Sequence, residues 1–297
     1  MSKLSVIILS YNTKEITKKC LDSINKSIIK NKQKNLYELI IIDNASTDGS
    51  CEMINKWKKN NSLNYQTHTI FNKKNIGYPK ANNQGLSKAT GKYILFLNSD
   101  VEISNVNFEN IIEFLDKNSK VGALTVKVVL PSGNIDSASH RGFPTIWNSF
   151  CYFSKLEFLF GKLPILGKVV GGYHMTHKDL SIIHDIDSPS GAFYFTRKDI
   201  VKDLKGFDDK FFMYGEDLDL SYRMKKRGYR IIYYPIFQVF HLKYASGLKK
   251  KNKKIMQKTK KYFYDSMKRF YRKHYERFNI EIINKAIYFF IDLKSKL

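Results

Sequence analysis

The sequence contains few cysteines and no long apolar run. Its three cysteines, Cys20, Cys51 and Cys151, are odd in number, far apart and outside metal-ligand spacing, so we expect reduced thiols in a cytoplasmic protein. No apolar segment approaches the ~18 to 20 residues that cross a bilayer. The apolar run that follows Met1 is soon interrupted by polar residues, which argues against a secretory signal peptide.

Acidic residues are scarce beside basic ones, with 27 Asp and Glu against 51 Lys and Arg and a net charge of +24. The excess is concentrated in residues 249–297, which hold 16 Lys and Arg but only four Asp and Glu. Such charge favours a polyanionic partner: nucleic acid, anionic lipid or a phosphate-bearing substrate. Scattered lysines can also form an ordinary solvated surface. The hydrophobic share of 43% predicts a packed globular core rather than a disordered chain.

Strand-like and helix-like segments alternate through the first hundred residues. Apolar strand patterns cover Leu4–Leu9, Tyr37–Asp43, Tyr65–Asn72 and Tyr93–Asp100, and helical spacing covers residues 15–29, 49–59 and 80–89. Strands that alternate with helices of this length predict βαβ units and a mainly parallel sheet. The length of the chain allows one large α/β domain or two small ones.

Polar residues follow each of these four strands. Ser10, Tyr11 and Asn12 come after the first, Asp43 ends the second, and Asp100 stands at the tip of the fourth. Any one of these ends could be an ordinary turn. A carboxylate at the tip of an apolar strand is nevertheless costly to bury unless a metal or a substrate pairs with it. Because ligands of open parallel sheets bind beyond the carboxyl ends of the strands, this edge is the predicted binding site.

The second half of the sequence has a mixed character. A strand and turn are predicted from Val121, a strand with a short helix within 190–208, and a helix from Glu216 that ends at Gly228 before another strand. Residues 145–179 are rich in aromatics and glycine and fit neither pattern. We expect a flexible acceptor loop or lid there.

Motifs in a characteristic order give the chain a resemblance to a known family. They are "VIILSYN", "IIIDNASTDGS", "NKKNIGYPKANNQGL", "YILFLNSD", "SGAFYFTRKDI" and "GFDDKFFMYGEDLDLSYRMKKRGYRI", followed by His241. The chain resembles bacterial family 2 glycosyltransferases of the GT-A fold, in their rhamnosyltransferase-like branch, from about Lys3 to Ser246. The resemblance implies a catalytic domain over 1–248, with a nucleotide-sugar-binding half (1–103) and an acceptor-binding half (104–248), before a basic amphipathic helical tail (249–297).

The resemblance implies a nucleotide-diphospho-sugar donor in the first half. Ser10, Tyr11 and Asn12 would hold the nucleoside. Asp43 would accept a hydrogen bond from the imide N–H of uracil or thymine, which cytosine lacks. Gly77 would let the backbone approach the ligand closely. Further donor contacts would come from Asn75, Asn82, Asn98, Ser99 and Asp100, although Asn75 and Asn82 could cap the following helix instead.

The triplet Asn98, Ser99 and Asp100 stands where the family has its Asp-X-Asp metal motif. By resemblance, Asp100 and His241 would bind Mg²⁺ or Mn²⁺, which neutralises the charge that develops on the leaving diphosphate. With a single carboxylate in the triplet, we expect the metal to arrive largely with the donor. Lys243 and Ser246 could also help to hold the diphosphate.

The resemblance also assigns the acid–base step. Asp217 would be the general base that deprotonates the acceptor hydroxyl in one in-line, inverting displacement, and Glu216 would contact the acceptor or the donor sugar. Adjacent carboxylates at a helix N-terminus also suit the helix dipole, so a structural role stays open. Gly191 and Ala192 would leave room for the acceptor sugar, beside an apolar wall formed by Phe211, Phe212 and Tyr214.

The basic tail is predicted to be helical from Ile255 to Leu297. Apolar positions recur at helical spacing, first at Phe263, Met267, Phe270 and His274, and then at Ile280, Ile283, Ile287 and Phe290. Basic amphipathic helices can lie on anionic membranes, which would suit an enzyme that is peripheral on the inner face of the membrane. The stripe could instead pack on the catalytic domain, mediate a homodimer or bind nucleic acid.

The predicted function is an inverting, metal-dependent glycosyltransferase of surface polysaccharide synthesis. It would move a sugar, which the resemblance suggests is L-rhamnose, from a dTDP- or UDP-sugar to a glycan or lipid-linked acceptor. A basic nucleic-acid-binding protein is one alternative, but acidic strand ends would repel phosphate, so no nucleic-acid partner is expected. A nucleotidyltransferase of related fold is another, although "SYNTKEITKKC" after the first strand lacks the glycines of a phosphate-binding loop. The intact Glu216–Asp217 pair argues against a non-catalytic subunit.

Overall fold

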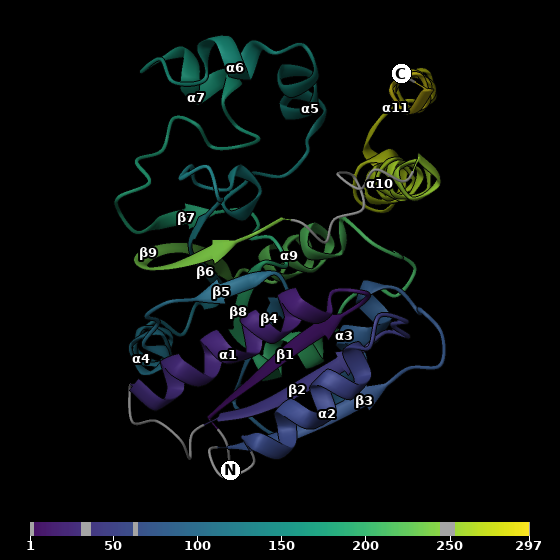
Figure 1. The fold of residues 1–297 in the computed structure, drawn as a ribbon. Helices are drawn as coiled ribbons and strands as arrows, with labels where there is room; N and C mark the ends of the chain where they lie inside the picture. The colour runs from purple at the N-terminus through teal and green to yellow at the C-terminus, as the bar shows by residue number, and fades with distance from the viewer. Residues whose placement is uncertain (1–2, 31–36, 62–64, 244–252, 297) are drawn as a thin grey trace.

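The computed structural model describes residues 3–30, 37–61, 65–243 and 253–296. The first part of the chain alternates strands and helices as predicted (Figure 1). Its elements are β1 (Leu4–Ser10), α1 (Lys14–Lys30), β2 (Tyr37–Asp43), α2 (Ser50–Asn60), β3 (Gln66–Phe71), α3 (Tyr78–Lys88) and β4 (Tyr93–Asn98). Each predicted strand and helix is confirmed to within a few residues at its ends.

The second part of the chain extends the same sheet. Its elements are β5 (Val101–Ile103), α4 (Phe108–Lys117), β6 (Val121–Val129), α5 (Ile146–Phe153), α6 (Leu156–Phe160), α7 (Leu166–Val170), β7 (His184–Ile186), β8 (Phe193–Arg197), α8 (Lys198–Asp203), α9 (Glu216–Lys226) and β9 (Arg230–His241). One nine-stranded sheet has the order β3-β2-β1-β4-β8-β6-β9-β5, with β7 paired to β9.

Strand register brings the predicted polar residues to one edge. The neighbours of β1, which are β2 and β4, both run parallel to it. Ser10 lies opposite Asp43, and Leu9 lies opposite Asn98, so three strands end at the same level. The parallel prediction holds in this half, whereas β8 runs antiparallel to both β4 and β6 and makes the other half mixed.

At the other end of the strand order, β5 and β9 form a short antiparallel pair. In it, Val101 of β5 lies opposite His241 at the end of β9. Residue 241 is thus placed beside Asp100, although 141 positions of sequence separate the two.

Two apolar clusters form the core, one on each face of the sheet. Side chains of α1, α2 and α4, such as Leu21, Ile54 and Ile111, pack on one face, and those of α3, α8 and α9, such as Leu86 and Leu220, pack on the other. Strand residues alternate between the faces, as Ile7 and Ile8 do. This burial fixes the register that aligns the strand ends.

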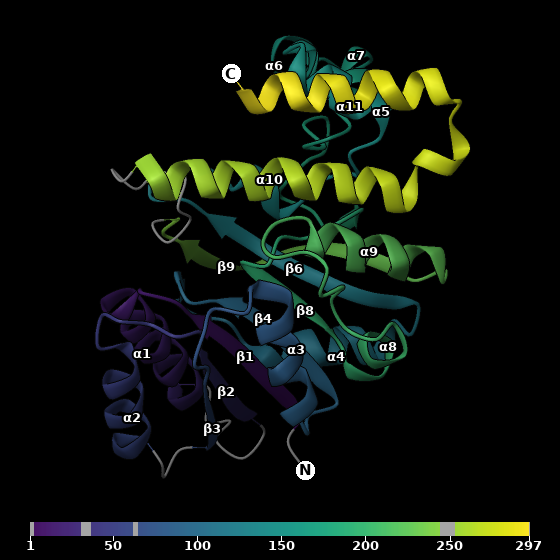
Figure 2. The ribbon, with the colours of Figure 1, turned by 90° about the vertical axis from the view of Figure 1, so that its right-hand side faces the viewer.

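The prediction for residues 145–179 needs correction. They contain the helices α5, α6 and α7 instead of a simple loop, and Thr145 caps α5 by accepting a hydrogen bond from the Asn148 backbone N–H at 3.1 Å. The tail is helical as predicted, and it consists of two helices, α10 (Lys253–His274) and α11 (Glu281–Lys296), joined through a 3₁₀ turn at Glu276–Phe278 (Figure 2). In this hairpin α11 packs along α10, and the Tyr271 hydroxyl of α10 donates to Asn284 of α11.

Candidate active site

The β1 and β2 ends form a cradle held together by short hydrogen bonds. Asn12 has a left-handed backbone conformation (φ 52°). Its side-chain Oδ1 accepts from the Thr47 N–H at 2.7 Å, and its backbone N–H donates to Ser46 Oγ at 2.8 Å. Ser10 is fully buried, with its hydroxyl 3.0 Å from that of Thr17. Beside them Tyr11 is exposed, so its ring is free to meet a ligand base.

Asp43 has one satisfied and one unsatisfied carboxylate oxygen. It is fully buried at the end of β2, where Oδ1 accepts from the Ser46 N–H at 2.8 Å. Among the described residues, no side chain or backbone group donates to its buried Oδ2 within hydrogen-bond distance, although burial and then the nearby carboxylate raise the pKa of the Cys51 thiol. A buried acceptor without a donor costs free energy. The geometry therefore leaves this oxygen available for a donor N–H of a ligand.

The loop before α3 is built around backbone contacts. Asn75 Oδ1 accepts from the Gly77 N–H at 3.0 Å and from the Asn44 amide at 3.0 Å. Gly77 has φ 87°, and a Cβ there would lie 2.8 Å from the carbonyl oxygen of Phe212, so the protein's own backbone requires a glycine. Asn82 is buried and donates to the Tyr78 carbonyl at 3.0 Å within α3, so its amide is used inside the helix.

Tyr78 lies at the centre of the site. Its hydroxyl donates to Asn98 Oδ1 at 3.1 Å, and it fills the space where a Cβ on Gly191 would lie only 2.5 Å away. Burial and then the negative charges of Glu216, Asp217 and Asp100 raise the pKa of this phenol well above its ordinary value. The charges of all three predicted carboxylates thus influence the same side chain.

The acceptor room expected at residues 191–192 is occupied by protein. Tyr78 takes the space beside Gly191, and Ala192 is fully buried in the core. Phe211 is also buried, packed against Leu218 and Phe270, and so belongs to a core cluster rather than to a sugar-facing wall. Phe211 is buried because residues 207–215 pack between α3 and α10, where Asn83 contacts Phe207 and Tyr262 contacts Phe212.

Asp100 and His241 form a buried pair. His241 Nε2 lies 3.2 Å from Asp100 Oδ1, and Nδ1 lies 3.0 Å from Asp136 Oδ2. Burial lowers the pKa of the imidazole, but hydrogen bonds and charges from both carboxylates raise it to about 9. Ser99, between Asn98 and Asp100, is buried, with its hydroxyl 3.5 Å from that of Thr13.

This pair fits the predicted role of binding a divalent cation through two side chains. An imidazole whose other nitrogen contacts a carboxylate, together with a second carboxylate, is a typical arrangement of metal ligands and their supporting groups. Among the described residues, no group of three or more His, Cys, Asp or Glu side chains is placed to hold a metal ion. Oxygens of a bound diphosphate would therefore have to complete the coordination.

Lys243 contacts the same group of residues. Its ammonium lies 2.8 Å from Asp136 Oδ1. Burial opposes ionisation, but hydrogen bonds from His241 and Lys243 hold the pKa of Asp136 below its ordinary range. Ser246, also predicted to meet the diphosphate, lies outside the described residues.

The N-terminus of α9 carries the two predicted catalytic carboxylates. Asp217 Oδ2 forms a 2.6 Å ion pair with Arg141, and its Oδ1 accepts from the Leu218 N–H at 2.7 Å. Neighbouring Glu216 is buried, and no partner among the described residues reaches its Oε2. Burial and then the charge of Asp217 raise the pKa of Glu216 well above its ordinary value. Displaced pKa values of this kind are common among groups that move protons.

Tyr214 stands next to these carboxylates. It has φ 71°, an uncommon backbone conformation for a residue with a side chain. Its ring packs edge-on against Phe263 of α10 at 5.8 Å, and its buried hydroxyl has no partner within the described parts of the chain. Tyr214 Oη and Glu216 Oε2 thus have no hydrogen-bond partner among the described residues, and a polar ligand could supply one.

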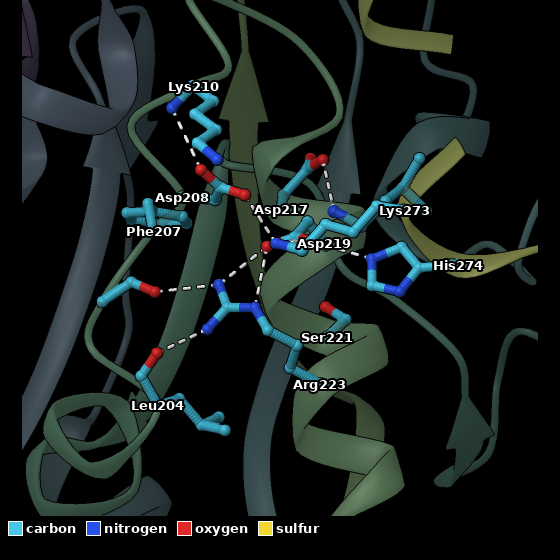
Figure 3. A network of polar contacts seen from close by, with 12 residues as sticks. Leu204, Phe207, Asp208, Lys210, Asp217, Asp219, Ser221, Arg223, Lys273 and His274 are labelled. Carbon is cyan, nitrogen blue, oxygen red and sulfur yellow. Dashed lines mark hydrogen bonds and ion pairs between the residues drawn. The ribbon is translucent and has the colours of Figure 1, made fainter. Parts of the chain in front are cut away.

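A polar network ties α10 to α9 behind the catalytic carboxylates (Figure 3). Fully buried Asp219 lies 2.8 Å from Arg223, 2.7 Å from Lys273 and 2.8 Å from His274. Burial opposes ionisation, but the three basic neighbours lower the pKa of Asp219 to about 2. Helix α10 thus packs on the helix that carries Asp217, which is the outcome expected if the tail packs on the catalytic domain.

Three residues of the site lie outside the sequence prediction: Tyr78, Asp136 and Arg141. Tyr78 stands within the quoted motif that contains Gly77, so the motif was a signal for it. Asp136 and Arg141 follow β6 in a segment with no motif. Their proximity to His241 and Asp217 arises from tertiary packing alone.

The strand order and the site together define the GT-A fold of nucleotide-sugar transferases. A mannosyltransferase from Pyrobaculum calidifontis, solved with GDP-Man and Mn²⁺, matches with a TM-score of 0.58 at 17% identity over 91% of this chain and 63% of that one. TarS of Staphylococcus aureus matches with a TM-score of 0.54 at 17% identity, over 91% and 43%. These likenesses confirm the predicted fold.

Sequence profiles place the chain in a family. The profile "Glycosyl transferase family 2" matches residues 5–179, which is more than half of the chain, and "Glycosyl transferase family group 2" matches residues 172–290. The chain therefore belongs to glycosyl transferase family 2. The predicted enzyme class, a family 2 glycosyltransferase, is confirmed at this level.

Curated relatives are longer proteins. The O-antigen biosynthesis protein RfbC of Myxococcus xanthus is 22% identical over 246 residues, which are 82% of this chain and 18% of RfbC. The poly-beta-1,6-N-acetyl-D-glucosamine synthase of Staphylococcus epidermidis is 26% identical over 232 residues, which are 78% of this chain and 48% of the synthase. The chain thus spans less than half of the length of these two relatives.

Proposed function

We propose that this chain is an inverting, metal-dependent glycosyltransferase that moves a sugar from a UDP- or dTDP-sugar to a glycan or lipid-linked acceptor in surface polysaccharide synthesis. The observation that carries the proposal is the buried pair of Asp100 and His241, whose side chains lie 3.2 Å apart at the carboxyl end of β4. Next to it, the Tyr78 hydroxyl donates to Asn98 at 3.1 Å, and burial and the charges of Glu216, Asp217 and Asp100 raise the pKa of this phenol. These contacts support a cation-binding pair and a proton-accepting pair at one site, as a single displacement requires.

The donor would bind at the β1–β2 edge. The free Oδ2 of Asp43 would accept the imide N–H of the base, and exposed Tyr11 would cover the base. Asp100 and His241 would hold Mg²⁺ or Mn²⁺, which supplies electrostatic neutralisation of the departing diphosphate. Asn75, Asn98 and Ser99 would also lie near the donor, since hydrogen bonds hold their side chains to Asn44, Tyr78 and Thr13.

The acceptor hydroxyl would be deprotonated by Asp217 as it attacks the anomeric carbon. Arg141 holds one oxygen of Asp217 in place, which orients the carboxylate. Glu216, with its raised pKa and unpaired Oε2, would hydrogen-bond a sugar hydroxyl. General base catalysis of this kind typically contributes a factor of about 10² to 10⁴ in rate.

Relatives named for O-antigen biosynthesis and poly-beta-1,6-N-acetyl-D-glucosamine synthesis support a polysaccharide product. Solved neighbours with GDP-Man and Mn²⁺, and with UDP, support a nucleotide-sugar donor and a divalent metal. L-Rhamnose as the sugar follows only from the motif resemblance. A homodimer and a location at the inner face of the membrane belong to the same proposal.

The test is thermal stabilisation of the purified chain by a panel of UDP-, dTDP- and GDP-sugars, each with Mn²⁺, Mg²⁺ or EDTA. A matching donor at about 100 times its Kd adds about 2.7 kcal/mol to the free energy of unfolding and raises Tm by several degrees. We expect this only with metal and a uracil or thymine nucleotide. Stabilisation by duplex or single-stranded nucleic acid in place of nucleotide sugars would contradict the proposal.

A further inference from the structure

The short helices α5–α7 expose an unusual amount of apolar side chain. Phe158 is 86% exposed and Ile165 is 80% exposed. Around them stand other large apolar residues that are at least 38% exposed: Trp147, Phe150, Leu159, Phe160, Leu163, Leu166 and Val169. We call residues 146–170 the apolar cap. An exposed apolar group of this size on a globular protein usually marks an interaction site.

Helix α11 exposes a second apolar group. Ile282, Phe289, Phe290 and Leu293 are 72%, 63%, 62% and 42% exposed and share one side of the helix, whereas Ile291 on the opposite side is buried. We call these four residues the α11 stripe. The buried side of α11 faces α10, where Asn284 accepts a hydrogen bond from Tyr271 at 2.5 Å. The stripe is therefore not used to hold the hairpin together.

The apolar cap and the α11 stripe lie at the same end of the molecule. Both views place α11 with α5–α7 at the end opposite β2 and β3 (Figures 1 and 2). The ammonium of Lys294 in α11 lies 5.7 Å from the ring centre of Phe153 in α5. The two apolar groups therefore border each other.

The charge around these apolar groups is positive. Lys155, Lys162 and Lys168 are exposed in the apolar cap, whose acidic residue, Glu157, is buried and paired with His174 at 2.9 Å. In α11, Asp292 pairs with Lys268 of α10. Two copies of such a surface would bring like charges together, whereas an anionic bilayer would neutralise them. Within the described residues, no helix is long and apolar enough to cross a membrane.

We propose that the apolar cap and the α11 stripe form one surface that docks on an anionic lipid bilayer at the depth of its headgroups. Exposed Phe, Ile and Leu would enter the acyl boundary, and the surrounding lysines would meet anionic headgroups. The inference goes beyond the predicted tail, because the cap lies in the catalytic part of the chain.

The cap also contacts the acceptor side of the site, and this part of the argument rests on the proposed function. Tyr152 of α5 packs on Tyr173 at 5.4 Å, the Tyr173 phenol influences the pKa of the Arg141 guanidinium, and Arg141 pairs with Asp217 at 2.6 Å. A docked enzyme would thus present Asp217 close to the bilayer, where a lipid-linked acceptor has its glycan.

The experiment measures binding of the full chain to vesicles of phosphatidylcholine alone or with ~30% phosphatidylglycerol, at ~0.1 M and ~1 M salt. We expect binding to anionic vesicles, weakened by salt. The double variants F158S/I165S and F289S/F290S should each reduce it at least about tenfold, since exposed side chains contribute to docking but not to folding. Trp147, which is 49% exposed in the cap, should shift its emission to the blue, whereas Trp57 is buried.

Ile29→Ser is the matched control, because Ile29 is 43% exposed on α1, away from this surface. It should leave vesicle binding unchanged. Unchanged binding in both double variants, or equal binding to neutral vesicles, would overturn the proposal, and loss in only one variant would overturn the claim of a single surface. Self-association that these variants abolish, without vesicle binding, would assign the surface to a second copy. Nucleotide-sugar stabilisation, measured on the same proteins, reports separately on the proposed function.

Discussion

The two sides of the candidate site are built in different ways. The donor side consists of neighbouring strand ends, where Ser10 and Asp43 are aligned by strand register. The α9 side is assembled from distant segments, since Asp217 is paired with Arg141 and its helix is held from behind by α10. The donor side therefore depends on the sheet, whereas the α9 side depends on contacts that single substitutions can remove. Substitutions on the two sides should separate donor binding from sugar transfer.

Asp217→Asn should abolish most sugar transfer but leave donor binding nearly unchanged. Loss of the general base should lower the transfer rate by about 10³-fold or more, while the Kd of the donor stays within about twofold. Transfer assays and donor titration measure the two effects. Asp199→Asn, at an exposed position of α8, is the control. An equal loss of donor binding and transfer would remove Asp217 from the role of base.

Asp100→Asn should weaken donor binding through the loss of a cation ligand. Removing one of two cation ligands should weaken metal-dependent donor binding by about 10- to 100-fold. Calorimetric titration of the donor with Mn²⁺ and with EDTA measures this effect. Full transfer activity of the unmodified protein in EDTA would contradict the metal role of Asp100 and His241.

Arg141→Lys tests how the α9 side orients its base. Lysine keeps the charge but lacks the planar fork of arginine, so kcat should fall about tenfold with little change in the donor KM. Lys127→Arg, at a partly exposed position in β6, serves as the control. A change in the donor KM alone would place Arg141 on the donor side.

Asp219→Asn should destabilise the contact between α9 and α10. The lowered pKa of Asp219, about 2 against an ordinary 3.8, corresponds to roughly 2 kcal/mol at neutral pH. That stabilisation is present above pH 3.8 and is lost as the pH falls towards 2. Urea unfolding at pH 7 and at decreasing pH measures it. A destabilisation that did not shrink on acidification would point to lost packing instead of lost charge.

Glu216→Gln should change the free energy of unfolding in a way that depends on pH. A carboxyl with a raised pKa stabilises the fold fully below its ordinary value of 4.5, and this stabilisation is lost as the pH rises. The amide avoids the loss, so the variant should gain stability over the unmodified protein by about 1 kcal/mol or more at alkaline pH. Thermal unfolding from pH 4.5 to pH 8.5 tests the trend, and a flat difference would contradict it.

In the tail, the sequence predicted the apolar helix faces but not which of them are buried. Of the predicted apolar positions in α10, Phe270 and His274 pack on the core, as one of the alternatives required. In α11 the same kind of spacing remains exposed, as Phe290 and Ile283 do. Helical periodicity marks an apolar face, but it does not specify what covers that face.

The sequence by itself determined the strands, their alternation with helices and the polar residues at their ends. These features follow from local patterns and from the two-residue period of a buried sheet, so Asp43 and Asp100 were found without the structure. The partners of the candidate site residues, in contrast, depend on the tertiary structure. Arg141 reaches Asp217 across 76 positions, and Asp136 reaches His241 across 105. No local pattern encodes such pairs, because their proximity depends on how whole segments pack.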